Sequence, residues 1–149
     1  MDQLDGPRLF RIPAAPYQAL FKTVRTHLLM AELSKAAILN ALRAGHAYLA
    51  ADTVGDATGF VFRAESGDHI TGIMGDEITW QPGLTLLMHA PTKARLRLFK
   101  DGALVEERRA QTWRYAVESP GIYRVEADLR RQFWIAANPI YVRTMKGGQ

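Results

Sequence analysis

The sequence predicts a mainly β protein, an immunoglobulin-like antiparallel β-sandwich preceded by an N-terminal helical hairpin. Apolar residues recur every three or four positions before residue 45 and alternate with polar residues after it. Turn residues then separate the alternating segments at a spacing of about ten, which is typical of sandwiches. We divide the chain into an extended lead-in with the helical hairpin at 1–45, the β-sandwich domain at 46–143 and a frayed tail at 144–149.

The first predicted helix begins at Pro16, because the first turn of a helix tolerates proline. His27 lies on or beside its apolar face, where a single histidine is more often packed or capping than a ligand. We expect this face to form an interface, because it carries more large side chains than the sandwich can cover. The interface candidates are spaced by three and four positions: Leu20, Phe21, Val24 and Leu28.

The second predicted helix begins after Ser34 and ends at Arg43. Serine is a favoured N-cap, and Arg43 places a cation near the negative end of the helix dipole. Gly45 supplies the left-handed residue with which many helices end. The two helical segments together predict a hairpin of helices.

The alternating pattern after Gly45 predicts a series of strands. Trp113, Tyr115 and Val117 share one face of a strand. A sheet with one buried face and one solvent-exposed face is typically antiparallel. Asp101-Gly102 is a signal for a two-residue hairpin turn. The predicted strands are 46–50, 59–65, 69–74, 84–89, 94–99, 103–108, 112–118, 121–128 and 133–142.

Aromatic side chains are candidates for the core and for a binding surface. Tyr123 follows the turn at 119–121 and opens a strand, as does the corner tyrosine of immunoglobulin-like sandwiches. We expect its ring to be buried and its hydroxyl to bond to the backbone. Trp80, which precedes the turn at 81–83, is the ring that we expect to be exposed as a binding surface.

The sequence carries no motif of a catalytic or metal site. Asp68-His69 lies in a glycine-flanked turn, and 72–77 reads as a bend between two strands rather than a calcium or phosphate loop. Neither Gly-x-Ser-x-Gly nor a cysteine nucleophile is present. No two of the four histidines have the short spacing that places two imidazoles on one metal: His27, His46, His69 and His89. We therefore expect no catalytic residue, no metal ligand and no cofactor.

Composition and charge indicate the kind of protein, its location and the partners that we expect. The 149 residues are 48% hydrophobic and 23% charged, as in a globular domain, and the absence of cysteine excludes disulfides. No signal peptide or membrane span is visible, so we expect a cytoplasmic protein without a membrane partner. The net charge is +4, but the arginines are scattered among acidic residues, so we expect no nucleic-acid partner.

The chain resembles the polymerase and histidinol phosphatase (PHP) family of metal-dependent phosphoesterases over about residues 13–143. Residues 16–21, 26–29 and 41–48 resemble the end of the catalytic domain. The later segments look like the sandwich domain that one subgroup appends: Gly59-Phe60-Val61-Phe62, Met74-Gly75-Asp76-Glu77, Leu98-Phe99-Lys100-Asp101-Gly102, Pro120-Gly121-Ile122-Tyr123-Arg124-Val125-Glu126 and Trp134-Ile135-Ala136-Ala137-Asn138-Pro139-Ile140-Tyr141-Val142.

The resemblance implies no metal ligand for this chain. The family holds its metals through an early His-x-His, scattered His and Glu residues, and a late Asp-x-His. The late motif would lie shortly before Pro13, where the chain has neither the motif nor a histidine. We expect the chain to be the C-terminal piece of a longer protein, one product of a split gene, or a segment excised for expression.

The resemblance implies a non-catalytic accessory or assembly domain of a PHP-type phosphoesterase. Its partner through the N-terminal helices would be a PHP catalytic domain or a second copy of this chain. The alternative is a monomer in which the helical hairpin folds onto the sandwich. An alternative from the residues alone is a free-standing carbohydrate- or peptide-binding sandwich that uses Trp80 and the sheet edges.

We predict that the isolated chain binds no divalent metal ion tightly and hydrolyses no phosphoester. A site with fewer than three convergent ligands seldom holds zinc or manganese. Metal analysis of the purified chain and an assay on a chromogenic phosphodiester check this prediction. Stoichiometric metal together with turnover would contradict it.

Overall fold

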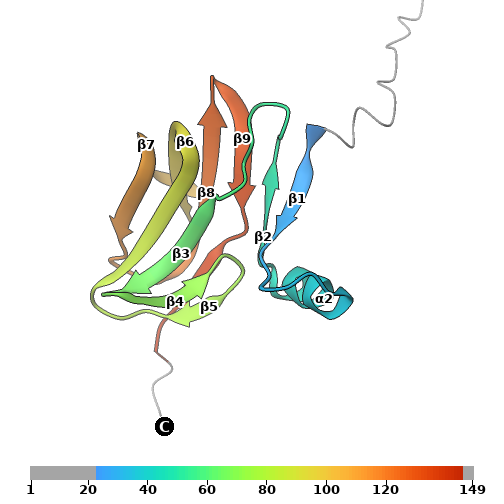
Figure 1. Ribbon diagram of the computed structural model, residues 1–149. Coiled ribbons are helices and arrows are strands. Elements are labelled where there is room, and N and C mark those ends of the chain that lie inside the picture. Colours follow the sequence, from blue (N-terminus) through green and yellow to red (C-terminus); the bar gives the residue numbers. More distant parts are fainter. Residues whose placement is uncertain (1–22, 146–149) are drawn as a thin grey trace, which may run out of the picture.

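The computed structural model describes residues 23–145, which form a mainly β fold with one helix beside it (Figure 1). The β content predicted from the alternating pattern is therefore confirmed. The elements, in chain order, are β1 (Arg25–Leu28), α2 (Lys35–Ala44), β2 (Ala47–Ala50), β3 (Val61–Ser66), β4 (His69–Ile73), β5 (Glu77–Thr79), β6 (Leu84–Lys100), β7 (Ala103–Ala116), β8 (Gly121–Leu129), β9 (Gln132–Ala137) and β10 (Ile140–Arg143).

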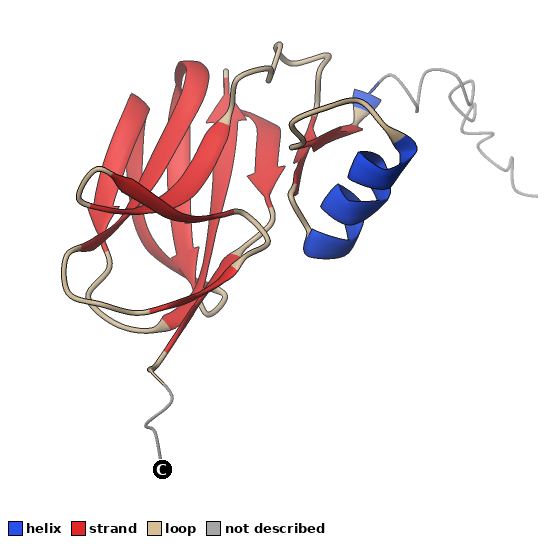
Figure 2. Ribbon diagram, turned by 60° about the horizontal axis from the view of Figure 1, so that its bottom comes forward, coloured by secondary structure: helices blue, strands red, loops and turns tan. Residues whose placement is uncertain are grey.

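The strands form a curled, almost entirely antiparallel sheet. Its main path has the order β1-β2-β9-β8-β6-β3-β4, with β7 paired to β6 and with β10 paired to both β8 and β5. The pairing of β10 with β5 is parallel. Figure 2 shows the sheet curling over itself, while α2 lies outside it next to β1 and β2.

The core fills the inside of the curl with alternate side chains of the strands. On β8, Tyr123, Val125 and Ala127 are buried, whereas the residues between them face outward. Trp134 on β9 is fully buried, and its indole Nε1 donates to the carbonyl oxygen of Gly55 at 2.8 Å. The buried indole is thus satisfied, as a polar group in a core must be.

The observed strands differ from the predicted ones in several places. The predicted strands 103–108 and 112–118 are one strand, β7, and β5 was not predicted. The predicted strands 84–89 and 94–99 are one strand, β6, with an irregularity around Pro91. The predicted strand 133–142 is two strands, β9 and β10, separated at Asn138 and Pro139. Proline has no N–H to donate to a ladder, so it is found at such irregularities and breaks.

The prediction of a helix through Leu28 is wrong for residues 25–28, which form the strand β1. This strand pairs antiparallel with β2, with Thr26 opposite Leu49 and His27 opposite Tyr48. Apolar residues four apart over so short a stretch also fit a strand, and pairing to a sheet overrides a weak helical preference. Residues 16–22 of the predicted helix lie outside the described residues.

The second predicted helix is confirmed as α2. The hydroxyl of Ser34 accepts a hydrogen bond from the backbone N–H of Ala37 at 3.1 Å, and Gly45 is left-handed with φ 71°. The backbone N–H of His46 then donates to the carbonyl oxygen of Ala41 at 2.9 Å, which closes the helix end. Within residues 23–145, no helix is long and apolar enough to cross a membrane.

The prediction for Tyr123 is confirmed. Its ring is 1% exposed, and its hydroxyl donates to the carbonyl oxygen of Ser119 at 2.7 Å. Burial raises the pKa of Tyr123, because the ionised phenolate is disfavoured in the core. The ring therefore ties the turn at 119–121 to the inside of the sheet.

We predict that Tyr123→Phe destabilises the chain by about 1 kcal/mol, because it removes one buried hydrogen bond. Tyr123→Ala should cost about 3–5 kcal/mol, because it also leaves a cavity. Urea denaturation followed by tryptophan fluorescence measures both. Equal losses of stability in the two variants would contradict the expectation that the buried ring contributes more to stability than the hydroxyl does.

Candidate functional site

Trp80, the predicted binding residue, is only partly open to solvent. Its ring is partly buried against the core, and its indole Nε1 donates to the carbonyl oxygen of Val117 at 2.9 Å. Trp80 is thus half-buried, whereas the other two tryptophans, Trp113 and Trp134, are buried. Its role as a binding surface stays a prediction. Trp80 precedes the turn at 81–83, and its backbone N–H donates to the carbonyl oxygen of Arg143 at 2.7 Å, which fixes it beside β10.

The predicted interface residues divide between described and undescribed parts of the chain. Leu20 and Phe21 lie outside the described residues. Val24 is 47% exposed, and Leu28 is half-buried on β1. Further exposed aliphatic side chains lie nearby in sequence, within what we call the N-terminal unit (residues 24–50): Leu33, Leu39, Leu42 and Leu49.

Helix α2 contributes two of these exposed aliphatic side chains. Ala41 is its one buried residue, whereas Leu39 and Leu42 are 39% and 53% exposed. Residues three apart lie on the same side of a helix, so these two leucines are neighbours on a side away from Ala41. Leu33, just before the helix, is 88% exposed.

The strands of the N-terminal unit are fixed to the sheet by Tyr48 and its neighbours. The imidazole of His27 stacks on the ring of Tyr48 with centroids 4.7 Å apart, and its Nε2 lies 3.1 Å from Oδ1 of Asp52. The hydroxyl of Tyr48 donates to the carbonyl oxygen of Ala57 at 2.9 Å. Burial, together with the nearby Asp52 and Asp56, raises the pKa of Tyr48 to about 12.

The C-terminal end of α2 meets the turn between β4 and β5, and we call this contact the α2 junction. The backbone N–H of Gly75 donates to the carbonyl oxygen of Pro139 at 2.8 Å, and Nδ2 of Asn138 donates to Gly45 at 2.8 Å. Nε2 of His46 lies 2.7 Å from Oδ1 of Asp76. The predicted bend at 72–77 is thus confirmed, and it holds α2 in place.

A second feature, which sequence reasoning missed, is a groove of about 1010 Å³ at the end of the sheet where β8 turns into β9. We call it the basic groove. It combines residues from β6, β7 and the β8–β9 turn, so residues as distant in sequence as Thr92 and Arg131 line the same groove. Its lining residues are Thr92, Lys93, Ala94, Arg95, Glu107, Arg108, Arg109, Asp128, Leu129, Arg130 and Arg131.

The described part of the chain offers no group of three or more His, Asp or Glu side chains that could hold a metal ion. Its histidines are dispersed: His27 and His46 pair with aspartates, and His89 lies 2.8 Å from the hydroxyl of Thr112. In comparisons with known proteins, no family model, no curated protein and no solved structure matches this chain.

We predict that Gly75→Ala destabilises the chain by at least about 3 kcal/mol. Gly75 has φ +96°, and an added Cβ would lie 2.3 Å from the carbonyl oxygen of Ala44, so the α2 junction would have to open. Gly59→Ala is the matched control, because Gly59 has φ +88° but open space around its Cβ position. It should cost only about 1–2 kcal/mol, the ordinary cost of a left-handed residue. Thermal unfolding compares the two, and equal losses would show that the junction is not tightly packed.

Proposed function

We propose that this chain is a non-catalytic accessory domain that packs against a PHP-type phosphoesterase catalytic domain through its N-terminal unit. The observation that carries the proposal is the exposed apolar side of α2, with Leu39, Leu42 and the preceding Leu33. A helix of a folded domain normally buries an apolar stripe, and exposed apolar patches mark interaction surfaces. The helix is held at its C-terminal end, yet Leu39 and Leu42 face away from Ala41, the one residue that it buries.

The proposed partner follows from the position of the segments that resemble a PHP catalytic domain. Residues 26–29 and 41–48, which resemble the end of a PHP catalytic domain, are parts of β1, β2 and the end of α2. The exposed aliphatic residues lie between and beside these segments. An apolar surface within a segment that resembles the end of another domain is the surface expected to contact that domain.

We also propose that the curled sheet is an immunoglobulin-like sandwich. Tyr123 supports this, because a buried tyrosine at the start of a strand, bonded to a carbonyl four residues upstream, is a hallmark of such sandwiches. A sandwich has a closed core of its own, so it can be appended to a catalytic domain without completing its active site. The carbohydrate-binding alternative is less favoured, because its main candidate, Trp80, is partly buried and its Nε1 is already bonded.

We predict a complex between this chain and a phosphoesterase domain from the same organism that carries the His-x-His and Asp-x-His motifs. Replacing Leu39 and Leu42 together by Asp should weaken the complex at least tenfold. A buried leucine contributes about 1.5–3 kcal/mol, and each tenfold change in affinity corresponds to about 1.4 kcal/mol. Sedimentation velocity at micromolar concentration measures both the complex and the state of the chain alone.

The matched control replaces Ile70 and Leu104 by Asp, because these side chains are 57% and 51% exposed on β4 and β7, outside the N-terminal unit. The control variant should bind as the wild type does. Equal binding by the Leu39/Leu42 variant, or no complex at all, would contradict the proposal. A wild-type homodimer that the Leu39/Leu42 substitutions dissociate would assign the surface to a second copy instead.

A further inference from the structure

The basic groove holds the whole net charge of the chain. It is lined by six cationic side chains and by the two carboxylates of Glu107 and Asp128, an excess of four positive charges. The formal net charge of all 149 residues is also +4. The cationic and acidic residues outside the groove therefore balance, and the surplus is concentrated at one end of the sheet.

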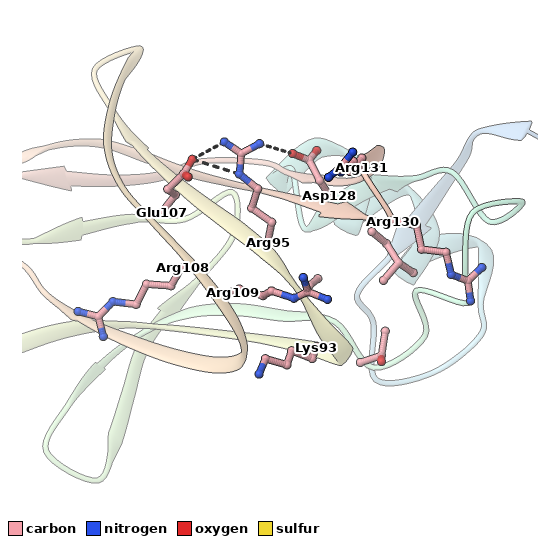
Figure 3. A pocket seen from close by; sticks show the side chains of 11 residues that line it. Lys93, Arg95, Glu107, Arg108, Arg109, Asp128, Arg130 and Arg131 are labelled. Carbon is pink, nitrogen blue, oxygen red and sulfur yellow. Dashed lines mark hydrogen bonds and ion pairs between the residues drawn. The ribbon is translucent and has the colours of Figure 1, made fainter.

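Two of the six cations are already engaged. Arg95 lies between Glu107 and Asp128, with Nη2 2.6 Å from Oε2 of Glu107 and Nη1 3.7 Å from Oδ2 of Asp128 (Figure 3). Arg108 pairs with Glu106 at 2.6 Å, and its guanidinium lies over the ring of Trp113 at 5.3 Å.

The other four cations are free of partners within residues 23–145: Lys93, Arg109, Arg130 and Arg131. Their side chains are exposed, so they keep their hydration and remain available to a ligand. The free guanidinium groups come from β7 and the β8–β9 turn, and the ammonium group of Lys93 comes from β6. Each guanidinium can donate two parallel hydrogen bonds to a phosphate, and the lysine adds a further positive charge.

The β8–β9 turn gives an independent reason to assign a role to these arginines. Arg130 and Arg131 form the whole two-residue turn, and both are left-handed, with φ 53° and 64°. Such turns favour Asn-Gly or Asp-Gly, because other residues are strained there. The β6–β7 hairpin of this same chain uses Asp101-Gly102 at its turn. Strain that is tolerated to present two arginines points to function rather than to stability.

The composition of the groove indicates the kind of anion. Its lining contains no aromatic side chain on which a nucleotide base could stack, and its apolar members are Ala94 and Leu129. A volume of about 1010 Å³ is at the upper end for a small-molecule site. Four free cations exceed what a single phosphate requires. We propose that the basic groove binds a small ligand that carries two or more phosphate groups.

The β8–β9 turn, which carries Arg130 and Arg131, lies at the end of the sheet away from α2 (Figure 1). The irregularity of β6 helps to build the basic groove. Between the pairs His89–Thr112 and Ala94–Ala110, residues 90–93 of β6 stand opposite Gln111 alone. The extra residues bulge from the ladder and carry Lys93 to the rim of the groove.

The test is isothermal titration of the full chain with inorganic tripolyphosphate in 150 mM salt, where distant surface charges are largely screened. We expect saturable binding at least tenfold tighter than that of orthophosphate. The key variant is Arg130→Asn with Arg131→Gly, because Asn-Gly is the favoured sequence for this turn and the variant should fold at least as stably as the wild type. It should lose affinity for tripolyphosphate at least tenfold.

The matched control is Lys35→Gln with Arg43→Gln, which removes the same charge from α2 and should change the affinity less than twofold. Absence of saturable binding by the wild type would overturn the proposal, and so would an equal loss in the control, since that would indicate general charge attraction. A single-stranded DNA 12-mer that binds more tightly than tripolyphosphate, and that also loses affinity in the turn variant, would replace the small ligand by a nucleic acid.

Discussion

Strand β6 is the element on which the other strands depend, because it pairs along its length with three of them. Its first part is bonded to β3 and its second part to β8, while β7 follows it through both. Leu86 and Met88 from the first part, and Leu96 and Leu98 from the second, are fully buried. A single continuous strand thus joins the two parts of the curled sheet, and the core lies between them.

The same strand explains why the surplus of positive charge gathers at one end. Along the second part of β6, Arg97 pairs with Glu126 at 2.9 Å and with Asp128 at 3.1 Å, so the outer face of the sheet is neutralised. Past this network, Arg95 and Arg108 still pair with carboxylates, but Lys93, Arg109, Arg130 and Arg131 have no carboxylate partner among the described residues. The positive surplus of the groove therefore comes from these four side chains.

Local patterns predicted most of the fold, and distant contacts account for what was missed. The strands, the capped helix α2 and the buried Tyr123 follow from signals within about ten residues, such as alternation, Ser34 and Gly45. The strand β1 was predicted as helix because its four residues form a strand only through pairing with β2, which the local sequence pattern does not indicate. The basic groove was missed for the same reason, because its arginines look scattered in sequence and meet only when β6, β7 and the β8–β9 turn come together.

The pairing of β2 with β9 has a consequence for the order in which the chain folds. Leu49 stands opposite Ala136, and β1 pairs with β2, so β1 and β2 cannot join the rest of the sheet until β9 has been synthesised. Contacts between segments so distant in sequence form slowly. β1 and β2 are therefore synthesised before the strand that joins them to the sheet, and during that interval a chaperone or an already folded neighbour can bind the leucines of the N-terminal unit.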